Sequence, residues 1–414
     1  FPMARLSRSA RLHGRQADGR RRPRLGDKGL VVLIALANMF VCMSLDMYLP
    51  AIPSMAGQLG TTPDLVNLTM ALFYAFLAVG TVVVGPLSEK YGRRKPLLVC
   101  IALYVVASLG CAWSCSVQAL IVFRIGEALG GGGMVAIRTA LVKDCFPAER
   151  RGKVLAVANA LSMIAPMAAP VAGSLLLVFF DWRAVFFVLA FWGALCWGLA
   201  LFLEEPLGLA KRYRGSIPKA LGRLFVVARN RSFTWLLLTT SLLLVPFMGY
   251  VAVSSYVYMD VFGVSAQGYG LLYAANTLFS VLAPLVYVRL SHRWSAARFM
   301  RLVTGGTLLS GVLLCLIGGA SPFLFLVAVI PMTVAECLLR PVAVPLLLDQ
   351  QEGDTGSASS LINFAYTLVG SAGMLIGSFP VFGYRGDLAA LCVVLSVVPG
   401  CLLALLNRRL RLFR

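Results

Sequence analysis

Six ionisable side chains lie inside long apolar stretches of this sequence. They are Asp46, Arg124, Glu127, Arg138, Glu336 and Arg340. An ionisable group at bilayer depth costs about 2.5–3.5 kcal/mol on insertion scales and is by default a functional candidate. A buried carboxyl can hold and release a proton, and a nearby guanidinium changes how tightly it does so. These residue types therefore predict proton binding and charge pairing.

Asp46 and Arg124 have similar expected depths. Asp46 lies about one helical turn, and Arg124 about two turns, from the outer ends of their apolar stretches. We expect them to face each other, with Glu127 on the same face as Arg124 because it follows three positions later. Movement of Arg124 relative to these carboxyls would couple proton release to substrate. The alternatives are a static pair between two helices and, for Glu127, a counter-charge for a cationic substrate.

The other three charged groups allow simpler interpretations. Glu336 and Arg340 are four residues apart, which predicts an ion pair within one helix. Arg138 is expected at a cytoplasmic gate, or with its long side chain extended to lipid headgroups.

The composition indicates a protein that crosses the membrane many times. Of the 414 residues, 59% are hydrophobic and 13% charged, with a mean hydropathy of +0.84. Soluble domains are about 45–50% apolar and about 25% charged. The net charge of +20 is spread between apolar stretches, which argues against nucleic-acid binding. Two histidines and the absence of CxxC spacing argue against a metal site.

Twelve apolar stretches are long enough to span a bilayer, since a spanning helix needs about 20 residues. They cover residues 29–50, 65–86, 95–114, 118–142, 153–179, 184–203, 233–258, 268–290, 298–319, 321–348, 355–380 and 387–407. The fold class is therefore an all-α integral membrane protein with twelve transmembrane helices in two pseudo-symmetric six-helix bundles. We expect a basic tail (1–28), a first bundle (29–206), a linker (207–232), a second bundle (233–408) and a short tail (409–414).

The basic residues predict the orientation. The N-terminal tail has nine Lys and Arg, the segments after stretches two, four, six and eight have four, four, seven and four, and the C-terminal tail has four. The opposite side has only Arg183 and Arg385. Because cytoplasmic loops carry the excess of positive charge, both termini and the linker are predicted to be cytoplasmic. Part of the linker, residues 217–227, is predicted to be an amphipathic helix on the membrane surface.

The segment GPLSEKYGRRKPLL (85–98) is unusually charged for this chain. Its glycines and prolines predict a tight reversal at the membrane surface. Its spacing resembles the signature loop of the major facilitator superfamily, with Glu89 where that family usually has Asp. The resemblance implies a charge network that holds the cytoplasmic side closed, formed here by Gly85, Glu89, Gly92, Arg93, Arg138 and Asp144.

Further motifs are similar to the bicyclomycin-resistance (Bcr/CflA) group of drug:proton antiporters. They are SLDMYLPAIP (44–53), YVYMDVFGVS (256–265), GSASSL (356–361) and IAPMAAPVAG (164–173). The last resembles the antiporter motif, through Ala165, Pro166, Ala169, Pro170 and Gly173. Its small residues every four positions allow close helix packing. We interpret it either as ordinary packing or as a seal between bundles.

The resemblance implies proton-coupled efflux of hydrophobic or cationic drugs across the cytoplasmic membrane by a monomer without a cofactor. Its partners would be a small-molecule substrate, protons and the lipid bilayer. The alternative is export of one dedicated metabolite, a sugar or an amino acid, on the same fold. An enzyme is disfavoured because no histidine lies in a spanning stretch. Candidate residues of a substrate pocket are Asn38, Phe73, Tyr250, Tyr256, Asn276 and Asn363.

Overall fold

The computed structural model describes residues 25–351 and 355–410, and every regular element in these ranges is helical. The first bundle contains the helices α2 (Gly26–Asp46), α4 (Pro63–Tyr91), α5 (Arg94–Ala112), α6 (Val117–Cys145), α7 (Ala148–Phe179) and α8 (Arg183–Leu201). The second contains α10 (Arg231–Leu242) with α11 (Val245–Tyr256), α12 (Ala266–Leu290), α13 (Ala296–Leu316), α14 (Pro322–Asp349), α15 (Thr355–Ser378) and α16 (Tyr384–Leu410). The twelve predicted stretches thus correspond to helices.

Eleven helical stretches of the described chain are long and apolar enough to span a membrane. The remaining helix, α7, has 32 residues, of which Ile164–Phe179 forms a shorter apolar part. Serine side chains at 116, 265 and 321 accept hydrogen bonds from backbone amides three residues later, and so cap the starts of α6, α12 and α14.

Two predicted spans are interrupted. After α2 ends at Asp46, the chain continues through a 3₁₀ turn (Leu49–Ala51) into the short helix α3 (Ile52–Gln58). The seventh span is divided between α10 and α11, and it ends in a π-helical turn, Val257–Val261. Both interruptions lie beside prolines, Pro50 and Pro246, which lack the backbone donor that a continuous helix needs.

Helix α4 runs further than expected, because residues 85–91 are helical despite Pro86. The reversal is confined to Gly92, whose positive φ of 93° favours glycine. We call the end of the molecule that carries this reversal the basic end. The end that carries α3 is the opposite end.

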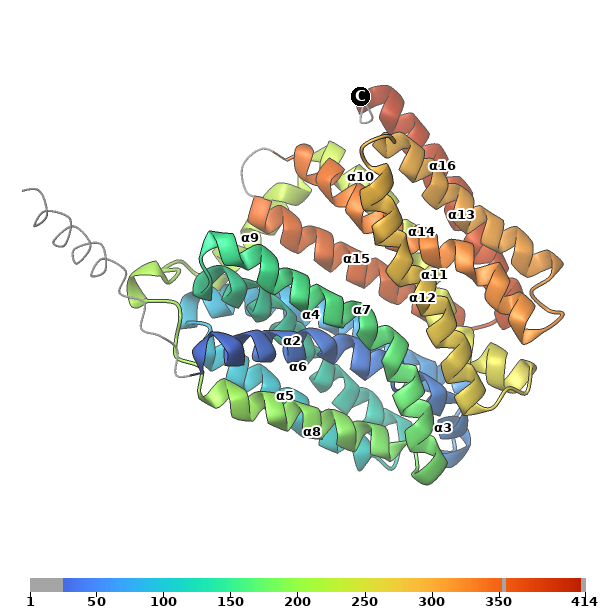
Figure 1. The fold of residues 1–414 in the computed structure, drawn as a ribbon, viewed down its shortest axis with the longest axis horizontal. Coiled ribbons are helices and arrows are strands. Elements are labelled where there is room, and N and C mark those ends of the chain that lie inside the picture. The colour runs from blue at the N-terminus through green and yellow to red at the C-terminus, as the bar shows by residue number, and fades with distance from the viewer. Residues whose placement is uncertain (1–24, 352–354, 411–414) are drawn as a thin grey trace, which may run out of the picture.

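The two bundles meet along α4 with α15 and along α7 with α12. In Figure 1 the bundles, coloured blue to green and yellow to red, lie closest near α3 and separate towards the basic end. At the opposite end, the hydroxyl of Tyr256 in α11 donates to the carbonyl oxygen of Pro63 at the start of α4 (3.3 Å). This end of the molecule is therefore closed by contacts between the bundles.

Between α8 and α10 the linker contains a 3₁₀ turn, Leu209–Lys211, and the helix α9, Ile217–Ala228. The predicted linker helix is therefore confirmed as a helix. α9 packs against α4 and α15, one helix from each bundle.

Candidate functional site

Asp46 is a buried carboxylate where the bundles meet. Its exposed fraction is 7%. The hydroxyl of Tyr273, on α12 of the second bundle, donates to its Oδ1 at 3.5 Å. No lysine or arginine of the described chain lies within ion-pairing distance, 4.0 Å, of this carboxylate. Asp46 is therefore placed to bind a proton or another cation at the boundary between the two helix bundles.

The expected contact between Asp46 and Arg124 is absent. Ser44, two residues before Asp46, faces the first bundle: its hydroxyl contacts the Tyr104 hydroxyl (2.6 Å), and its carbonyl oxygen accepts from Arg124 Nη1 (3.1 Å). Residues two apart on an α-helix are separated by about 200° around its axis. Asp46 therefore faces α12, while Arg124 stays inside the first bundle. Similar depth along the membrane did not imply a shared face.

Arg124 forms its ion pair with Glu127. Its Nη1 lies 3.0 Å from Glu127 Oε2, and both side chains are completely buried. Ser108 on α5 donates to the other carboxylate oxygen at 3.2 Å. The guanidinium lies over the rings of Phe73 (4.3 Å) and Tyr48 (4.8 Å). This cluster joins α2, α4, α5 and α6 in the interior of the first bundle.

Two of the hydrogen-bond donor nitrogens of Arg124 are without a partner in the described chain. Nε and Nη2 of Arg124 are buried and have no hydrogen-bond partner among the described residues. A buried donor without a partner costs about 1–3 kcal/mol or more. The guanidinium thus holds donors that a water molecule or a rearranged neighbour can use.

Aromatic side chains of α11 and α12 surround the Asp46 contact. Tyr250 and Tyr273 stack with ring centroids 6.1 Å apart, and Asn276 Nδ2 donates to the Tyr250 hydroxyl at 3.3 Å. Tyr250 and Asn276 are nevertheless buried, as is Asn38 on α2. Their role as pocket residues therefore stays a prediction.

Two other pocket candidates lie elsewhere. Phe73 packs beneath Arg124 inside the first bundle, and Tyr256 is at the opposite end, stacked on Tyr384 with centroids 5.2 Å apart. In this structure both rings fill helix contacts, and their role in a substrate pocket stays a prediction. Asn363 on α15 is exposed, as a pocket residue should be.

Glu336 and Arg340 do not form the predicted ion pair. The Cys337 thiol donates to Glu336 Oε2 (3.2 Å), whereas Arg340 Nη1 donates to Asn363 Oδ1 (3.5 Å) and its guanidinium lies 5.4 Å from the centre of the Tyr366 ring. Four-residue spacing permits the pair, but α15 offers Arg340 other partners.

Arg93 and Asp144 come together at the basic end, as the loop motif implied. Arg93 Nε donates to Asp144 Oδ2 at 2.8 Å, and its Nη1 donates to the Ser88 hydroxyl at 2.7 Å. The side chain of Glu89 is exposed and makes no ion pair with another described residue, so it is not the acid of this network. Arg138 is also outside it, deeper in α6 and beside Cys42 of α2.

Sequence reasoning missed Glu205, which follows α8. Its carboxylate accepts from the backbone amides of Arg93 (2.7 Å) and Arg94 (3.0 Å), at the start of α5. A Cβ at Gly92 would collide with this carboxylate. The linker is also tied to this turn, because Tyr213 N donates to the Glu89 carbonyl oxygen at 3.0 Å. The signal in the sequence was an acidic pair, Glu204–Glu205, beside a basic segment. Tyr273, by contrast, carried no signal that separates it from other tyrosines.

The predicted antiporter motif packs against α2 of its own bundle and against α12 of the second bundle. Ala165, Ala169 and Gly173 of α7 are buried, and a Cβ at Gly173 would meet the carbonyl oxygen of Met47, just after α2. On the same helix, Pro170 contacts Gly270 of α12; a Cβ there would lie 3.2 Å from the Pro170 carbonyl oxygen. Pro166 lies within α7, which continues through it.

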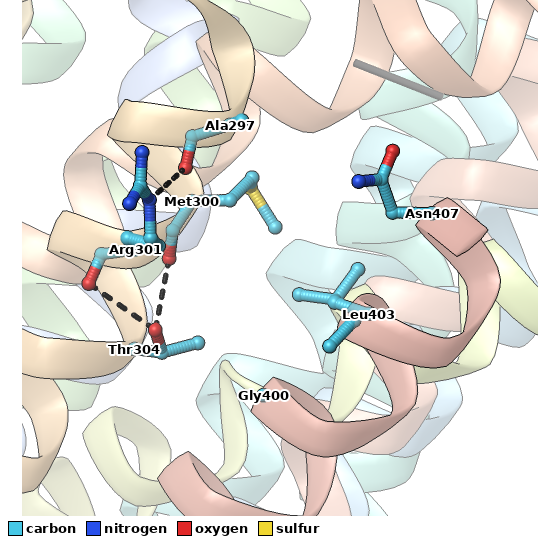
Figure 2. Close-up of a pocket in the computed structure, with 8 residues that line it drawn as sticks. Ala297, Met300, Arg301, Thr304, Gly400, Leu403 and Asn407 are labelled. Carbon is cyan, nitrogen blue, oxygen red and sulfur yellow. Dashed lines mark hydrogen bonds between the residues drawn. The ribbon is translucent and has the colours of Figure 1, made fainter. Parts of the chain in front are cut away.

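A separate pocket of about 310 Å³ lies between α13 and α16, away from these residues. Figure 2 shows Met300 of α13 extending towards Leu403 and Asn407 of α16, while Arg301 and Thr304 line the α13 side of the pocket. None of the residues predicted to bind substrate lines it.

Known proteins resemble this chain over most of its length. A Bacillus subtilis protein named "Uncharacterized MFS-type transporter YdgK" is 30% identical over 351 residues, covering 83% of this chain and 86% of the relative. A "Bicyclomycin resistance protein homolog" of Haemophilus influenzae is 25% identical, covering 89% and 94%. The crystal structure of the peptide transporter POT in complex with sulfate has the same fold, with a TM-score of 0.74, 16% identity and coverage of 93% and 96%.

The family model "Major Facilitator Superfamily" matches residues 34–374 and 244–409. The match includes both bundles, all the charged residues described above inside the helices, and the turn at Gly92. The chain is therefore a multi-pass membrane protein and a secondary transporter, and it belongs to the major facilitator superfamily.

Proposed function

We propose that this protein exports hydrophobic or cationic drugs across the cytoplasmic membrane in exchange for protons. The observation that carries the proposal is Asp46, a buried carboxylate between the two bundles without a basic partner in the described chain. A relative with 25% identity is named for bicyclomycin resistance, which supports a drug as cargo.

Asp46 is the proton-carrying residue in this mechanism. When a cargo cation or bulk water approaches, the ionised form is favoured, and the carboxylate accepts the Tyr273 hydroxyl at 3.5 Å, a contact that stabilises the charged form and joins the bundles. Protonation removes the charge and weakens this contact. The bundles then rock around the midplane, so that the site between them opens alternately to the two sides of the membrane, as in other transporters built from two halves.

Arg124 relays this change within the first bundle. It binds the Ser44 carbonyl oxygen, two residues before Asp46, and is held by Glu127. A shift of α2 on proton exchange therefore reaches the charged cluster through the backbone. This replaces the direct contact between Asp46 and Arg124 that the sequence predicted.

The decisive experiment uses the full-length protein in proteoliposomes. With an inward-directed proton gradient, we expect cargo such as ethidium to be moved against its gradient and each addition of cargo to release protons. Asp46→Asn should abolish both signals, whereas Glu89→Gln, which changes an exposed carboxylate outside any ion pair of the described chain, should leave them unchanged. Transport that is equally fast without a pH difference would exclude proton exchange.

The orientation can be tested separately. We propose that the basic end is cytoplasmic, that both termini lie there, and that the protein is a monomer. Cys115, exposed in the turn between α5 and α6 at the opposite end, should then react in intact cells with a membrane-impermeant maleimide. The Cys115→Ser variant identifies that signal. Labelling of Cys115 only after the cells are opened would reverse the orientation.

A second candidate is export of one dedicated polar metabolite, a sugar or an amino acid. The exposed polar pair Arg340 and Asn363 favours it over a purely apolar pocket. Cells that overproduce the protein distinguish the two candidates when tested against chemically diverse drugs. Resistance to several unrelated compounds, lost on addition of a protonophore, supports drug export; resistance to none supports the metabolite.

A further inference from the structure

Arg340 is an exposed arginine in the interior of a spanning helix. It lies nine residues before the end of α14 at Asp349, or about 13 Å along the helix axis. Its guanidinium donates to Asn363 Oδ1 at the long distance of 3.5 Å. No carboxylate oxygen of a described residue lies within 4.0 Å of its guanidinium nitrogens. Glu336, one turn away on α14, interacts with Arg340 electrostatically, but no carboxylate of the described chain is paired directly with the guanidinium, so its exposed donors are available to a ligand.

The exposed side of Arg340 belongs to the space between the bundles. Its neighbours Asn363 and Tyr366 are on α15, the helix that packs against α4 of the first bundle. Tyr74 of α4 reaches that interface, because a Cβ at Gly370 of α15 would lie 3.3 Å from the Tyr74 ring. Tyr74 is also within electrostatic range of Arg340 and Glu336. A guanidinium exposed to lipid tails would be costly, which agrees with a position facing this interface.

These groups form a recognition site of mixed character. The guanidinium offers a planar set of donors that matches a carboxylate in two-point geometry. The Tyr366 ring supports the guanidinium on one side, and Asn363 can rotate its amide towards a ligand oxygen. Glu336, one turn away, lies within electrostatic range of Arg340 but is not hydrogen-bonded to it, and its Oε2 accepts the Cys337 thiol instead.

We propose that Arg340, with Asn363 and Tyr366, binds a carboxylate group of the transported molecule. The proposal rests on the transport function above and adds a class of cargo to it, namely aromatic or apolar compounds that carry a carboxylate. In an amphoteric compound, this group would engage Arg340 while a basic group is left for Asp46.

The test measures binding, which needs neither a proton gradient nor transport. The purified full-length protein in nanodiscs is titrated with dansylglycine and with its neutral counterpart, dansylglycinamide. We expect the carboxylate dye to bind at least about tenfold more tightly, as one charged two-point contact of about 1.4 kcal/mol gives. Equal affinities, or binding of neither dye, would overturn the proposal.

Three variants place the carboxylate at Arg340. Arg340→Gln should remove the preference, and Arg340→Lys should retain part of it, because the charge remains without the planar fork. Asn363→Asp puts a carboxylate of nearly the same shape as the amide beside the guanidinium. The new acid should pair with Arg340 and remove the preference for the carboxylate dye, while the volume of the site is unchanged. A preference that survives in both Arg340→Gln and Asn363→Asp would overturn the assignment.

Arg301→Gln is the matched control, because Arg301 is an exposed arginine of the same bundle that lines the separate pocket in Figure 2. It should keep the full preference. Loss of the preference in Arg301→Gln alone would place the carboxylate in the pocket between α13 and α16 and contradict the proposal. Failure of proton exchange in the proteoliposomes, with the dye preference intact, would instead disprove only the proposed antiport.

Discussion

Arg124 and Ser44 join α6 to α2 through one hydrogen bond, from the guanidinium Nη1 to the carbonyl oxygen at 3.1 Å. The bond is buried and lies two residues before Asp46, whose side chain faces the other bundle. A backbone carbonyl thus connects the charged interior of the first bundle to the acid at the interface. In the proposed mechanism, Asp46 carries the proton and Arg124 responds to the position of α2, so the two roles belong to different residues.

The first prediction compares Asp46 with its partner Tyr273. Asp46→Asn removes the titrating group, so cargo-induced proton release in proteoliposomes should fall to the background. Tyr273→Phe removes only a hydrogen bond of 3.5 Å, which contributes no more than about 1.5 kcal/mol. Its transport rate should therefore fall by less than about tenfold. Equal losses in the two variants would show that the Tyr273 hydroxyl, and not the carboxyl alone, is essential.

The second prediction concerns the stability of the first bundle. Glu127→Gln leaves the completely buried Arg124 without its counter-charge, and breaking a buried pair costs about 3–5 kcal/mol. Ser108→Ala removes one neutral donor from the same carboxylate and should cost about 1.5–3 kcal/mol, because the acceptor is charged. Denaturant unfolding of the purified variants in detergent measures both values. A Glu127→Gln protein as stable as Ser108→Ala would mean that the pair is not a stabilising element.

The third prediction separates Glu205 from Glu89 at the basic end. Glu205→Ala removes the acceptor for the Arg93 and Arg94 amides, a charged hydrogen-bond set with about 1.5–3 kcal/mol per bond. Amide hydrogen exchange at residues 93 and 94 should become at least about tenfold faster, which corresponds to about 1.4 kcal/mol. Glu89→Ala, which changes an exposed side chain outside the ion pair of Arg93 with Asp144, should leave those exchange rates unchanged. Slow exchange in Glu205→Ala would show that these amides are protected by another acceptor.

The fourth prediction tests the packing of α7. Gly173→Ala places a methyl group against the Met47 carbonyl oxygen, so α7 and α2 must separate. We expect slower transport and a lower unfolding midpoint. Gly198→Ala is the control, since no atom lies within 4 Å of the point on α8 where its new methyl group would sit, and alanine favours a helix by up to about 1 kcal/mol. Similar behaviour of the two variants would argue against a close seal at Gly173.

The sequence predicted where the helices lie better than which side of each helix a residue occupies. Apolar length alone located the twelve spans, because a bilayer requires about 20 apolar residues whatever their partners. Apolar length did not reveal that two spans break near Pro50 and Pro246. It also did not show that α4 continues through Pro86. Those outcomes depend on neighbouring helices that satisfy the free backbone groups.

The pairing of charges was the least predictable part. Depth along the membrane correctly grouped Asp46 with Arg124, but the angular position of Asp46 on α2 directs it to Tyr273. Local spacing predicted the pair Arg124–Glu127 as neighbours, yet the same rule failed for Glu336 and Arg340. Spacing of three or four residues permits a contact; packing against other helices decides whether it forms.

The linker has a consequence for how the halves move. Its first part is hydrogen-bonded to the α4–α5 turn through Glu205 and Tyr213, so we expect it to move with the first bundle. Within the linker, α9 contacts both bundles, through α4 and α15. In the proposed rocking motion, α9 must lose contacts with α4 or α15 once per cycle, so a fluorescent reporter on α9 is expected to change its signal with each turnover.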